Sequence, residues 1–410
     1  MSALPEPAPV LSFEDARHVV EDHASRLRVP GKEVVDLLEA GGRVLAEAIN
    51  ADRDFPPFAR AARDGYAVRT ADLDKIPKTL TVAGEIRAGS RLEDLPMIGP
   101  GKAASIMTGA PAPRGADAVV MVEYTSASGG QVEVVRAVSA GENIVPAGSE
   151  ARRGERLLSP GSWLDEAGIA LAASVGRTRL VVYEKPRVGV LSTGDEVVDV
   201  DVTPGPHQIR NSNSYSLATQ ILAAGAEPVL LPVAPDERDR LRELISDGLE
   251  GDLLLLAGGV SMGQYDLVEQ VLTEMGAEFF FTGAQIQPGR PVVFGRVQGK
   301  YFFGLPGNPV STMVTFELFA RPMLERLGGM APRKLIFLSA RLKSEIRTKT
   351  GLKRFLPAVL AGEFERAEVE LAGWHGSGDV AAVARANCYV VVPPDRERLA
   401  PGEWVAVLRR

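Results

Sequence analysis

The spacing of hydrophobic and polar residues changes three times along the chain, and each change predicts a new structural unit. Residues 12–50 read as two helices separated by the Pro-Gly-Lys at 30–32, and Ser12 with Asp15 has the spacing of a capping box. Residues 51–150 contain short β-type runs that Gly and Pro interrupt every few positions. This second pattern predicts an irregular all-β unit.

From residue 186 onward, apolar runs alternate with amphipathic segments. RVGVLS and LLLLA read as buried strands, whereas ERDRLRELISDGLE reads as a charged amphipathic helix. Such alternation predicts βαβ units, a mostly parallel sheet, and ligands at the carboxyl ends of its strands. PVVFGRV and KYFFGLPG then predict a hairpin, followed by a helix from about Val310 to Leu327. Residues 331–410 return to short strands and predict a small β domain.

Composition narrows the classes of protein that fit this pattern. A chain of 410 residues exceeds one ordinary core, and at about 150 residues per domain it predicts two to four domains. A hydrophobic content of 45% and a charged content of 24% exclude a disordered or fibrous protein. The net charge of −7 argues against nucleic acid as the main partner, because an acidic surface repels phosphate backbones.

Cysteine and histidine are scarce, which limits the metal chemistry. The single cysteine, Cys388, excludes an intramolecular disulfide and a cysteine-based zinc site, and four histidines argue against a histidine-rich metal site. A metal here should be hard and oxygen-liganded, such as Mg²⁺. The first residues lack the pattern of a signal peptide, and no apolar run approaches the roughly 18 residues of a membrane helix. We therefore expect a cytoplasmic protein without a membrane partner.

Polar residues with possible chemistry gather in loops that follow buried strands. STGDE at 192–196 places Thr193, Asp195 and Glu196 at a strand's carboxyl end, where α/β domains bind ligands. In AGGVSMGQYD, adjacent glycines after a strand of four leucines would let an oxyanion approach the backbone, together with Ser261. Asp266 could act there or simply cap the following helix.

Other loops have plainer alternatives. Asp64 in DGYAV could belong to an ordinary Asp-Gly turn, and TGAP, which contains Thr108, could be a plain loop. PGRP and GLPGNP are two rigid Gly/Pro loops, in which Arg290 could face an anion or be a solvated surface residue.

Three common enzyme classes are disfavoured by their motifs. GVSMG fits the serine-hydrolase string, but no convincing Asp–His pairing accompanies it. The chain has no GxxxxGK[ST] and no GxGxxG after a strand, which argues against a P-loop nucleotide enzyme and a dinucleotide fold.

Seven segments together resemble one protein family. They are DGYAV, TGAP with GADAVVMVE, STGDE, NSNSYSL, GGVSMGQYD, PGRP and GLPGNPVST. In this order and spacing they resemble the molybdopterin molybdotransferase family, the proteins similar to the E-domain of gephyrin. Each motif alone is weak, but the resemblance runs from about residue 12 to the end of the chain.

The resemblance implies a multidomain α/β and β fold with four units. An elongated helical segment would comprise residues 1–50 and 149–178, with a β-rich domain inserted at 51–148. A molybdopterin-binding α/β domain with a parallel-type sheet would occupy 179–328, and a small C-terminal β-barrel 329–410. It also implies a homodimer whose active site lies between the α/β domain of one subunit and the inserted domain of the other.

The implied reaction is the last step of molybdenum cofactor synthesis. Adenylylated molybdopterin and molybdate would give the cofactor with release of AMP, assisted by Mg²⁺. A molybdopterin adenylyltransferase would act upstream and molybdoenzymes downstream.

The resemblance also implies the residues of the site. Catalytic positions would be Asp64, Thr108, Glu196, Asp236 and Asp266, with Glu196 and Asp266 as the Mg²⁺ ligands. With the loops above, binding positions would be Thr193, Gly194, Asp195, Ser212, Asn213, Ser214, Gly258, Gly259, Ser261, Gly263, Pro288, Gly289, Arg290, Pro306, Gly307, Asn308, Pro309 and Ser377.

Several positions depart from the family pattern. Gly283 and Gln287 stand where basic residues are usual, Glu150 replaces an Asp, and Pro357 replaces an Arg although Lys353 and Arg354 lie close in the sequence. These changes remove positive charge from the expected oxyanion site. Three alternatives therefore stay open: a non-catalytic molybdopterin-binding scaffold, a paralogue with altered oxyanion preference, and an enzyme that uses the same α/β domain on another nucleotide-like substrate. Four carboxylates among the expected site residues disfavour the scaffold, because they would repel an anionic ligand unless a cation intervened. They are Asp64, Glu196, Asp236 and Asp266.

Overall fold

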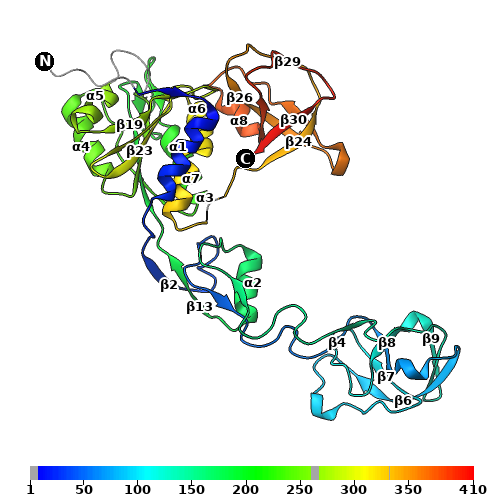
Figure 1. The fold of residues 1–410 in the computed structure, drawn as a ribbon. Coiled ribbons are helices and arrows are strands. Elements are labelled where there is room, and N and C mark those ends of the chain that lie inside the picture. The colour runs from blue at the N-terminus through cyan, green and yellow to red at the C-terminus, as the bar shows by residue number, and fades with distance from the viewer. Residues whose placement is uncertain (1–7, 260–266, 332) are drawn as a thin grey trace.

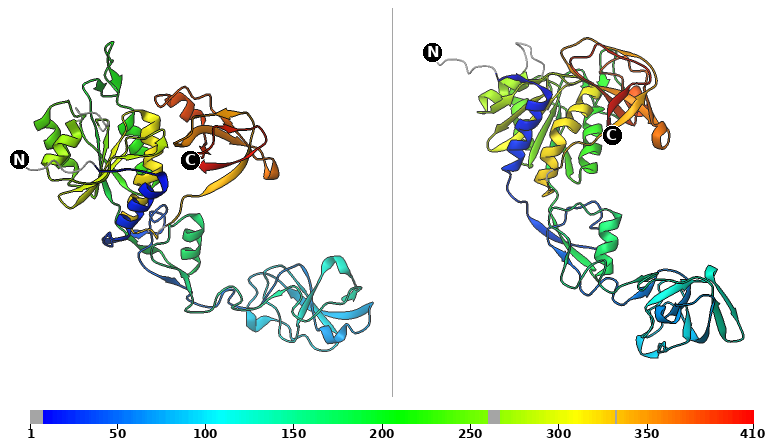
Figure 2. Two further views of the ribbon diagram at one scale, coloured as in Figure 1. Left: turned by 45° about the horizontal axis from the view of Figure 1, so that its top comes forward. Right: turned by 45° about the vertical axis from the view of Figure 1, so that its right-hand side comes forward.

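The computed structural model describes residues 8–259, 267–331 and 333–410. Its ribbon is elongated, with an α/β unit and a β-barrel at one end and a second β-sheet unit at the other (Figure 1). Two further views show the same separation (Figure 2). Among the described residues, no helix is long and apolar enough to cross a membrane.

The α/β unit is built on a mostly parallel sheet, as the strand–helix alternation predicts. Its strands are, in order, β17 (Glu227–Leu230), β14 (Arg187–Ser192), β18 (Leu253–Ala257), β23 (Lys300–Leu305), β22 (Val293–Val297) and β19 (Glu278–Phe281). The first four run parallel, and β22 and β23 form the predicted hairpin. Every residue of β18 is buried, which explains its uninterrupted leucines.

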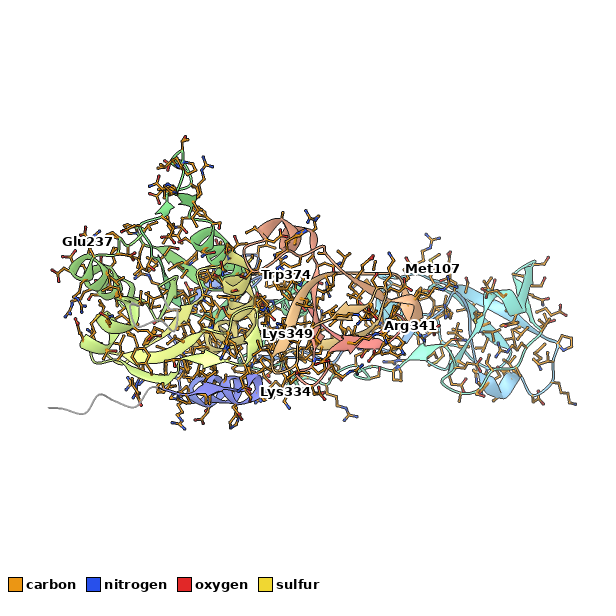
Figure 3. All side chains as sticks on the ribbon, turned by 90° about the horizontal axis from the view of Figure 1, so that it is seen from above. Met107, Glu237, Lys334, Arg341, Lys349 and Trp374 are labelled. Atoms are coloured by element: carbon orange, nitrogen blue, oxygen red, sulfur yellow. The ribbon has the colours of Figure 1, made fainter. Side chains whose placement is uncertain are left out.

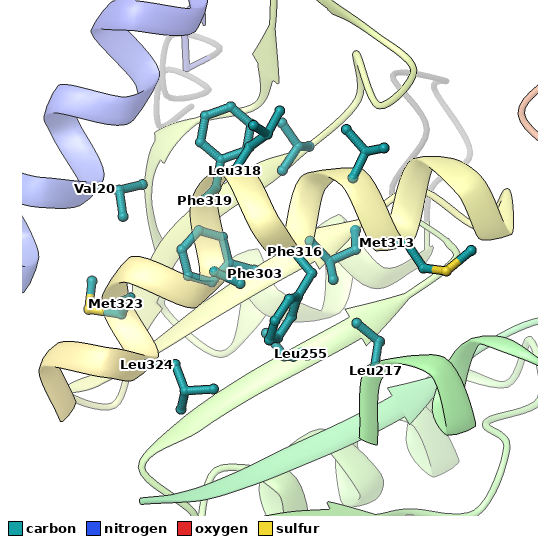
Figure 4. Packing of buried hydrophobic residues seen from close by; sticks show 14 of the residues in the cluster. Val20, Leu217, Leu255, Phe303, Met313, Phe316, Leu318, Phe319, Met323 and Leu324 are labelled. Atoms are coloured by element: carbon teal, nitrogen blue, oxygen red, sulfur yellow. The ribbon is translucent and has the colours of Figure 1, made fainter. Parts of the chain in front are cut away.

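Helices cover both faces of this sheet. Buried residues of α1 (Phe13–Ser25), α3 (Asn213–Ala223), α6 (Pro309–Thr315) and α7 (Arg321–Leu327) form one core with it. Residues of α4 (Arg238–Gly248) and α5 (Leu267–Glu274) form another. Figure 4 shows the first core, where Phe303 and Leu255 of the sheet lie beneath Phe316 and Phe319. The predicted helix from Val310 to Leu327 is continuous, with a π-helical turn over Phe316–Ala320 between α6 and α7.

The first helix, α1, forms at the predicted residues, but it packs on a different unit from the one we expected. The Ser12 side chain caps α1 by accepting a hydrogen bond of 3.1 Å from the backbone N–H of Asp15. Instead of belonging to the elongated segment, α1 packs on the α/β unit. The Phe13 ring lies 6.1 Å from that of Phe319 and 5.3 Å from that of Phe355.

The prediction of a second helix within residues 12–50 is wrong. Residues Lys32–Asp36 form β2, which pairs antiparallel with β13 (Arg179–Tyr183) and places Val34 opposite Val181. β-Branched side chains suit this pairing, and tertiary contact overrides a helical pattern. Gly42 then adopts a positive φ of 71°, which a helix interior does not allow. The elongated segment is therefore mainly β, with β3 (Ile49–Asn50), β12 (Arg156–Leu158) and a single described helix, α2 (Glu166–Ser174).

The inserted unit is the irregular all-β structure that the sequence predicts. Its sheet has the order β8 (Ala118–Met121), β5 (Gly65–Val68), β7 (Lys102–Ile106), β6 (Lys78–Ile86), β10 (Gln131–Val134) and β9 (Thr125–Ser128). A small pair, β4 (Arg60–Ala61) with β11 (Ile144–Val145), joins it to the elongated segment.

The C-terminal unit is a small barrel. Its strands are β26 (Lys353–Ala361), β27 (Glu368–Leu371), β24 (Phe337–Leu342), β30 (Trp404–Arg409) and β28 (Cys388–Val392), and the pairing of β26 with β28 closes it. Helix α8 (Val380–Arg385) packs on β26. β21 (Ile286–Gln287), from the α/β unit, adds to β26 and so connects the two units. The remaining short strands are β1 (Val10–Leu11), β15 (Val197–Val198), β16 (Ile209–Arg210), β20 (Gly283–Ala284), β25 (Ile346–Arg347) and β29 (Arg398–Leu399).

Candidate active site

A cavity of about 450 Å³ opens at the carboxyl ends of β14, β18 and β23. This is the edge at which parallel α/β sheets bind ligands. Its walls are Ser192, Thr193, Gly194, Glu196, Val197, Ile209, Arg210, Asn211, Ser212, Asn213, Asp236, Ala257, Gly258, Gly259, Pro291, Pro306, Gly307, Asn308 and Pro309. Most of the expected binding residues of the α/β unit therefore lie together around one cavity.

At the floor of the cavity, the backbone at Gly258 lies very close to the backbone at Thr193. Gly258 has a φ of 99°, and a Cβ built there would lie 2.9 Å from the carbonyl oxygen of Thr193. The backbone N–H of Gly258 donates to the carbonyl of Leu305, at 3.1 Å, at the end of the neighbouring strand. Glycine is thus required here, because a side chain would separate the loops that follow β14 and β18.

A buried hydrogen-bond network fixes the start of α3 beside β14. The Ser192 hydroxyl lies 3.0 Å from Asn211 Oδ1 and 2.9 Å from the Ser214 hydroxyl. The backbone N–H of Ser214 also donates to Asn211 Oδ1, at 3.1 Å. Ser214 is consequently buried behind the cavity and is not part of its lining. Its hydrogen bonds to Ser192 and Asn211 hold in place the part of the cavity wall at the start of α3.

Three carboxylates meet at one side of the cavity. Asp195 Oδ1 accepts a hydrogen bond of 3.0 Å from the backbone N–H of Asp236, and Asp236 and Glu196 line the cavity itself. Burial raises the pKa of Asp236 above its ordinary value, and the charges of Asp195 and Glu196 raise it further. The repulsion indicates a site that would be stabilised by a cation.

The Gly/Pro loop before α6 forms another part of the wall. Asn213 Nδ2 donates to the carbonyl of Gly307 at 2.7 Å, which ties this loop to α3. The backbone N–H of Val310 donates to the carbonyl of Ser377, at 3.0 Å. Ser377 therefore lies at the start of α6, beside the cavity but not in its lining.

The PGRP loop reaches the cavity only through Pro291. Pro288, Gly289 and Arg290 are not part of the lining, and the Arg290 side chain is exposed. Gly289 has a φ of 101° and is held against α6, where a Cβ would lie 2.3 Å from Thr315 Cγ2.

A buried arginine stands beside the position where the sequence loses a basic residue. Arg354 is 7% exposed, and its Nε donates to Gln287 Oε1 at 2.8 Å. Its Nη1 donates to the carbonyl of Leu352 at 3.1 Å. Burial lowers the pKa of Arg354, and no carboxylate pairs with it among the described residues. The structure therefore returns one positive charge to this region.

Asp64 and Thr108 lie far from the cavity of the same chain. Asp64 Oδ1 accepts hydrogen bonds from Thr108, at 2.6 Å from the backbone N–H and 2.8 Å from the hydroxyl. These bonds lower the pKa of Asp64. The pair lies in the inserted unit, at the opposite end of the molecule from the α/β sheet (Figure 1). One chain alone does not bring all of the expected catalytic residues together.

Some of the expected site residues lie outside the part of the chain that the structure describes. In addition, the cavity has lining residues that the sequence did not lead us to expect. Ser261, Gly263 and Asp266 lie outside the described residues. The cavity also uses Arg210, Asn211 and Pro291, which were not among the expected site residues. Arg210 directly precedes the NSNSYSL motif, and Pro291 ends PGRP, so proximity to a motif was the signal that could have identified them.

The donor set suits Mg²⁺ only in part. Over the described ranges, no group of three or more His, Cys, Asp or Glu residues could hold a metal ion. Glu196 and Asp236 nevertheless offer carboxylate oxygens at the cavity. This fits Mg²⁺, which is commonly bound through one or two carboxylates together with substrate phosphates.

Family models match three consecutive parts of the chain. Residues 11–176 match the MoeA N-terminal region (domain I and II), and residues 339–409 match the MoeA C-terminal region (domain IV). Residues 189–326, which include the cavity, match a probable molybdopterin binding domain. Fold and site thus define a multidomain protein whose α/β unit is of the molybdopterin-binding class.

Whole-chain relatives agree with these matches. A molybdopterin molybdenumtransferase of Nostoc is 34% identical over 98% of this chain and 94% of its own length. The protein of that name from Haemophilus influenzae is 33% identical over 92% of this chain and 93% of its own. The crystal structure of a molybdopterin biosynthesis MoeA protein from Pyrococcus horikoshii is 29% identical, with a TM-score of 0.77 over 98% of this chain and all of its own. This chain belongs to the MoeA, or molybdopterin molybdenumtransferase, family.

Proposed function

We propose that the protein is a molybdopterin molybdenumtransferase, which catalyses the final step of molybdenum cofactor synthesis. In the detailed reaction, adenylylated molybdopterin and molybdate give the molybdenum cofactor and AMP. The observation that supports this most directly is the cavity in the molybdopterin-binding domain, which is lined by carboxylates and by Gly/Pro loops.

The residues of the cavity suit cleavage of a phosphoanhydride. Such a reaction depends on positioning and charge neutralisation more than on a protein nucleophile. The described lining contains no Cys or His. The loops around Gly258 and Pro306–Pro309 are fixed by the hydrogen bonds given above, so they can hold a substrate without rearrangement.

We propose Glu196 and Asp266 as the ligands of Mg²⁺, with Asp236 close to Glu196. The ion, when bound, would offset the negative charge of the substrate phosphates. The raised pKa of Asp236 supports this assignment, because it results from burial and from the negative charges of Asp195 and Glu196, which a bound cation would offset. Binding of the pterin and phosphate would fall mainly to the backbone and to the loops.

We further propose a homodimer in which the inserted unit of one copy completes the cavity of the other. Support comes from the separation of Asp64 and Thr108 from the cavity within one chain. A molybdopterin adenylyltransferase would provide the substrate in the cytoplasm, and molybdoenzymes would receive the product.

The test is release of AMP from adenylylated molybdopterin, with and without molybdate. The purified protein should release AMP in a molybdate-dependent way and produce cofactor that activates an apo-molybdoenzyme. Tight binding of molybdopterin without AMP release would instead identify the non-catalytic scaffold.

A paralogue with altered oxyanion preference is the second candidate. Gly283, Gln287 and Pro357 replace family basic residues, whereas Arg354 adds a buried positive charge beside Gln287. Running the same assay with tungstate in place of molybdate tests this alternative. A higher rate with tungstate would favour it.

A further inference from the structure

The described lining of the cavity has only one cationic side chain, Arg210. The other charged residues that line it are Glu196 and Asp236, and Asp195 bonds to the backbone of Asp236 from behind. A ligand with a phosphate group would be repelled from the carboxylate side unless a cation intervened. Arg210, on β16, which pairs with the strand that directly follows Glu196, is therefore the described cationic residue of the lining that is available to an anionic ligand.

The Arg210 side chain is held at the base of a projecting segment. We name residues 199–208 the arm; all but one of them are exposed, and they form the green projection at the top of Figure 3. The arm leaves the domain after β15 and returns at β16, where Val198 pairs with Arg210. Arg210 Nε donates to the carbonyl of Val202, within the arm, at 3.1 Å.

The rest of the guanidinium is available to a ligand. No described residue hydrogen-bonds to Nη1 or Nη2 of Arg210, and no described carboxylate forms an ion pair with it. The next residue, Asn211, is buried in the network with Ser192 and Ser214, and its backbone N–H donates to the carbonyl of Val198 at 2.8 Å. One end of this short segment is thus fixed in the core, while Arg210 lines the cavity and its side chain bonds to the arm.

We propose that Arg210 binds a phosphate group of the ligand in this cavity through Nη1 and Nη2, and that the bound phosphate immobilises the arm. The planar guanidinium suits this double role, because one edge can keep the Val202 carbonyl while the other binds phosphate in a bidentate manner. The phosphate class of the ligand rests on the proposed function. The inference goes further by assigning the contact to a residue and coupling it to the arm.

Binding of AMP, compared with adenosine, tests the phosphate contact. Calorimetry on the wild-type protein should show a clear preference for AMP, and Arg210→Gln should weaken AMP binding by about 10-fold or more, as expected for loss of a charge-assisted hydrogen bond. Adenosine affinity should not change. Arg240→Gln is the matched control, because Arg240 lies in α4 of the same unit, pairs with Glu243 at 2.9 Å, and is not part of the cavity lining.

Hydrogen exchange of the arm tests the coupling. In the wild-type protein, AMP should slow the exchange of backbone amides in residues 199–208, whereas adenosine should not. Arg210→Lys keeps the charge but cannot bond to Val202 and hold phosphate in a bidentate manner at once. It should therefore bind AMP better than Arg210→Gln does, yet without protection of the arm.

Two results would overturn the proposal. One is an AMP affinity of the Arg210→Gln variant that stays within about twofold of the wild-type affinity. A change of that size is what we expect of the Arg240→Gln control. The other is a wild-type protein that binds AMP no better than adenosine. Failure of the proposed function is seen separately, as absence of molybdate-dependent AMP release by a wild-type protein that still prefers AMP to adenosine.

Discussion

Individual carboxylates in this protein have acidities that only their neighbours explain. Asp236 has a raised pKa because it is partly buried and faces Asp195 and Glu196. Asp64 has a lowered pKa because the backbone N–H and the hydroxyl of Thr108 donate to it. Two residues of one chemical type thus differ in acidity, and Asp64 stays ionised to a lower pH than Asp236 does.

Glu196→Gln should reduce AMP release by on the order of 10²-fold, as expected for loss of one electrostatic contributor. The physical reason is loss of a ligand that we propose for Mg²⁺. The measurement is a Mg²⁺ titration of AMP release for the wild type and the variant, with Asp266→Asn as a parallel variant. The matched control is Glu243→Gln in α4, which removes a carboxylate that pairs with Arg240 away from the cavity. Full wild-type activity in excess chelator would contradict the metal role.

Cys388 should be unreactive toward thiol reagents in the folded protein. Burial raises the pKa of its thiol to about 11, and the thiol donates a hydrogen bond of 3.3 Å to the carbonyl of Ala358. Near pH 8 this lowers the thiolate fraction by about 100-fold relative to an ordinary thiol, before any steric protection. Because the fold favours the protonated thiol, its contribution to stability is present at neutral pH and is lost as the pH rises towards 11.

Labelling with iodoacetamide, in native buffer and in denaturant, checks this. Modification should require unfolding, and Cys388→Ser should keep AMP release. Rapid labelling of the native protein, or loss of turnover by a folded Cys388→Ser variant, would show that the thiol takes part in the chemistry.

At the scale of elements, β18 connects the core to the cavity. Its five residues are buried between the helices of the two faces, and it pairs in parallel with β14 and β23. The backbone that leaves it at Gly258 forms the cavity floor. A change that loosens β18 should therefore affect both stability and the site.

Leu255→Ala should lower the free energy of unfolding by about 2–5 kcal/mol, because Leu255 is fully buried in the core between β18 and the helix α6 to α7. Urea unfolding measures this. Leu222→Ala, in α3, is the control, since Leu222 is 61% exposed and should change stability by less than about 0.5 kcal/mol. Equal effects of the two substitutions would show that the core is packed differently.

The whole molecule is extended, so its shape bears on how the site is assembled. The α/β unit and the barrel are joined directly by the pairing of β21 with β26, whereas the inserted sheet lies at the far end (Figure 2). A monomer would leave Asp64 and Thr108 without a described contact to the cavity. This separation is the reason for which we propose that a second copy completes the site.

Mixed dimers should show this directly. Asp64→Ala and Glu196→Ala homodimers should each be inactive, whereas refolded mixtures should recover activity, because one of the two shared sites in a heterodimer carries neither substitution. The readout is AMP release, with sedimentation equilibrium to establish the dimer. A protein that sediments only as the 43.7 kDa chain at micromolar concentration, or mixtures without recovery, would place the site within one subunit.

Much of the fold and of the site could be predicted because the signals are local. The Ser12 cap, the buried leucines of β18, the β22–β23 hairpin and the irregular β unit each depend on residues close in sequence. The loops with candidate residues could be located as well, because parallel strands bring their carboxyl ends to one edge. The domain boundaries and the roles of the site residues remain predictions.

Tertiary structure decided the features that depend on distant partners. Residues 32–36 form a strand because β13, far along the chain, pairs with them, and α1 lies against the α/β unit and the barrel because Phe13 contacts Phe319 of the former and Phe355 of the latter. Arg354 takes its place beside Gln287 through the pairing of β21 with β26, and Arg210 becomes part of the cavity lining through the pairing of β15 with β16. Local sequence determines which elements can form, whereas burial and pairing between distant segments determine where each side chain lies.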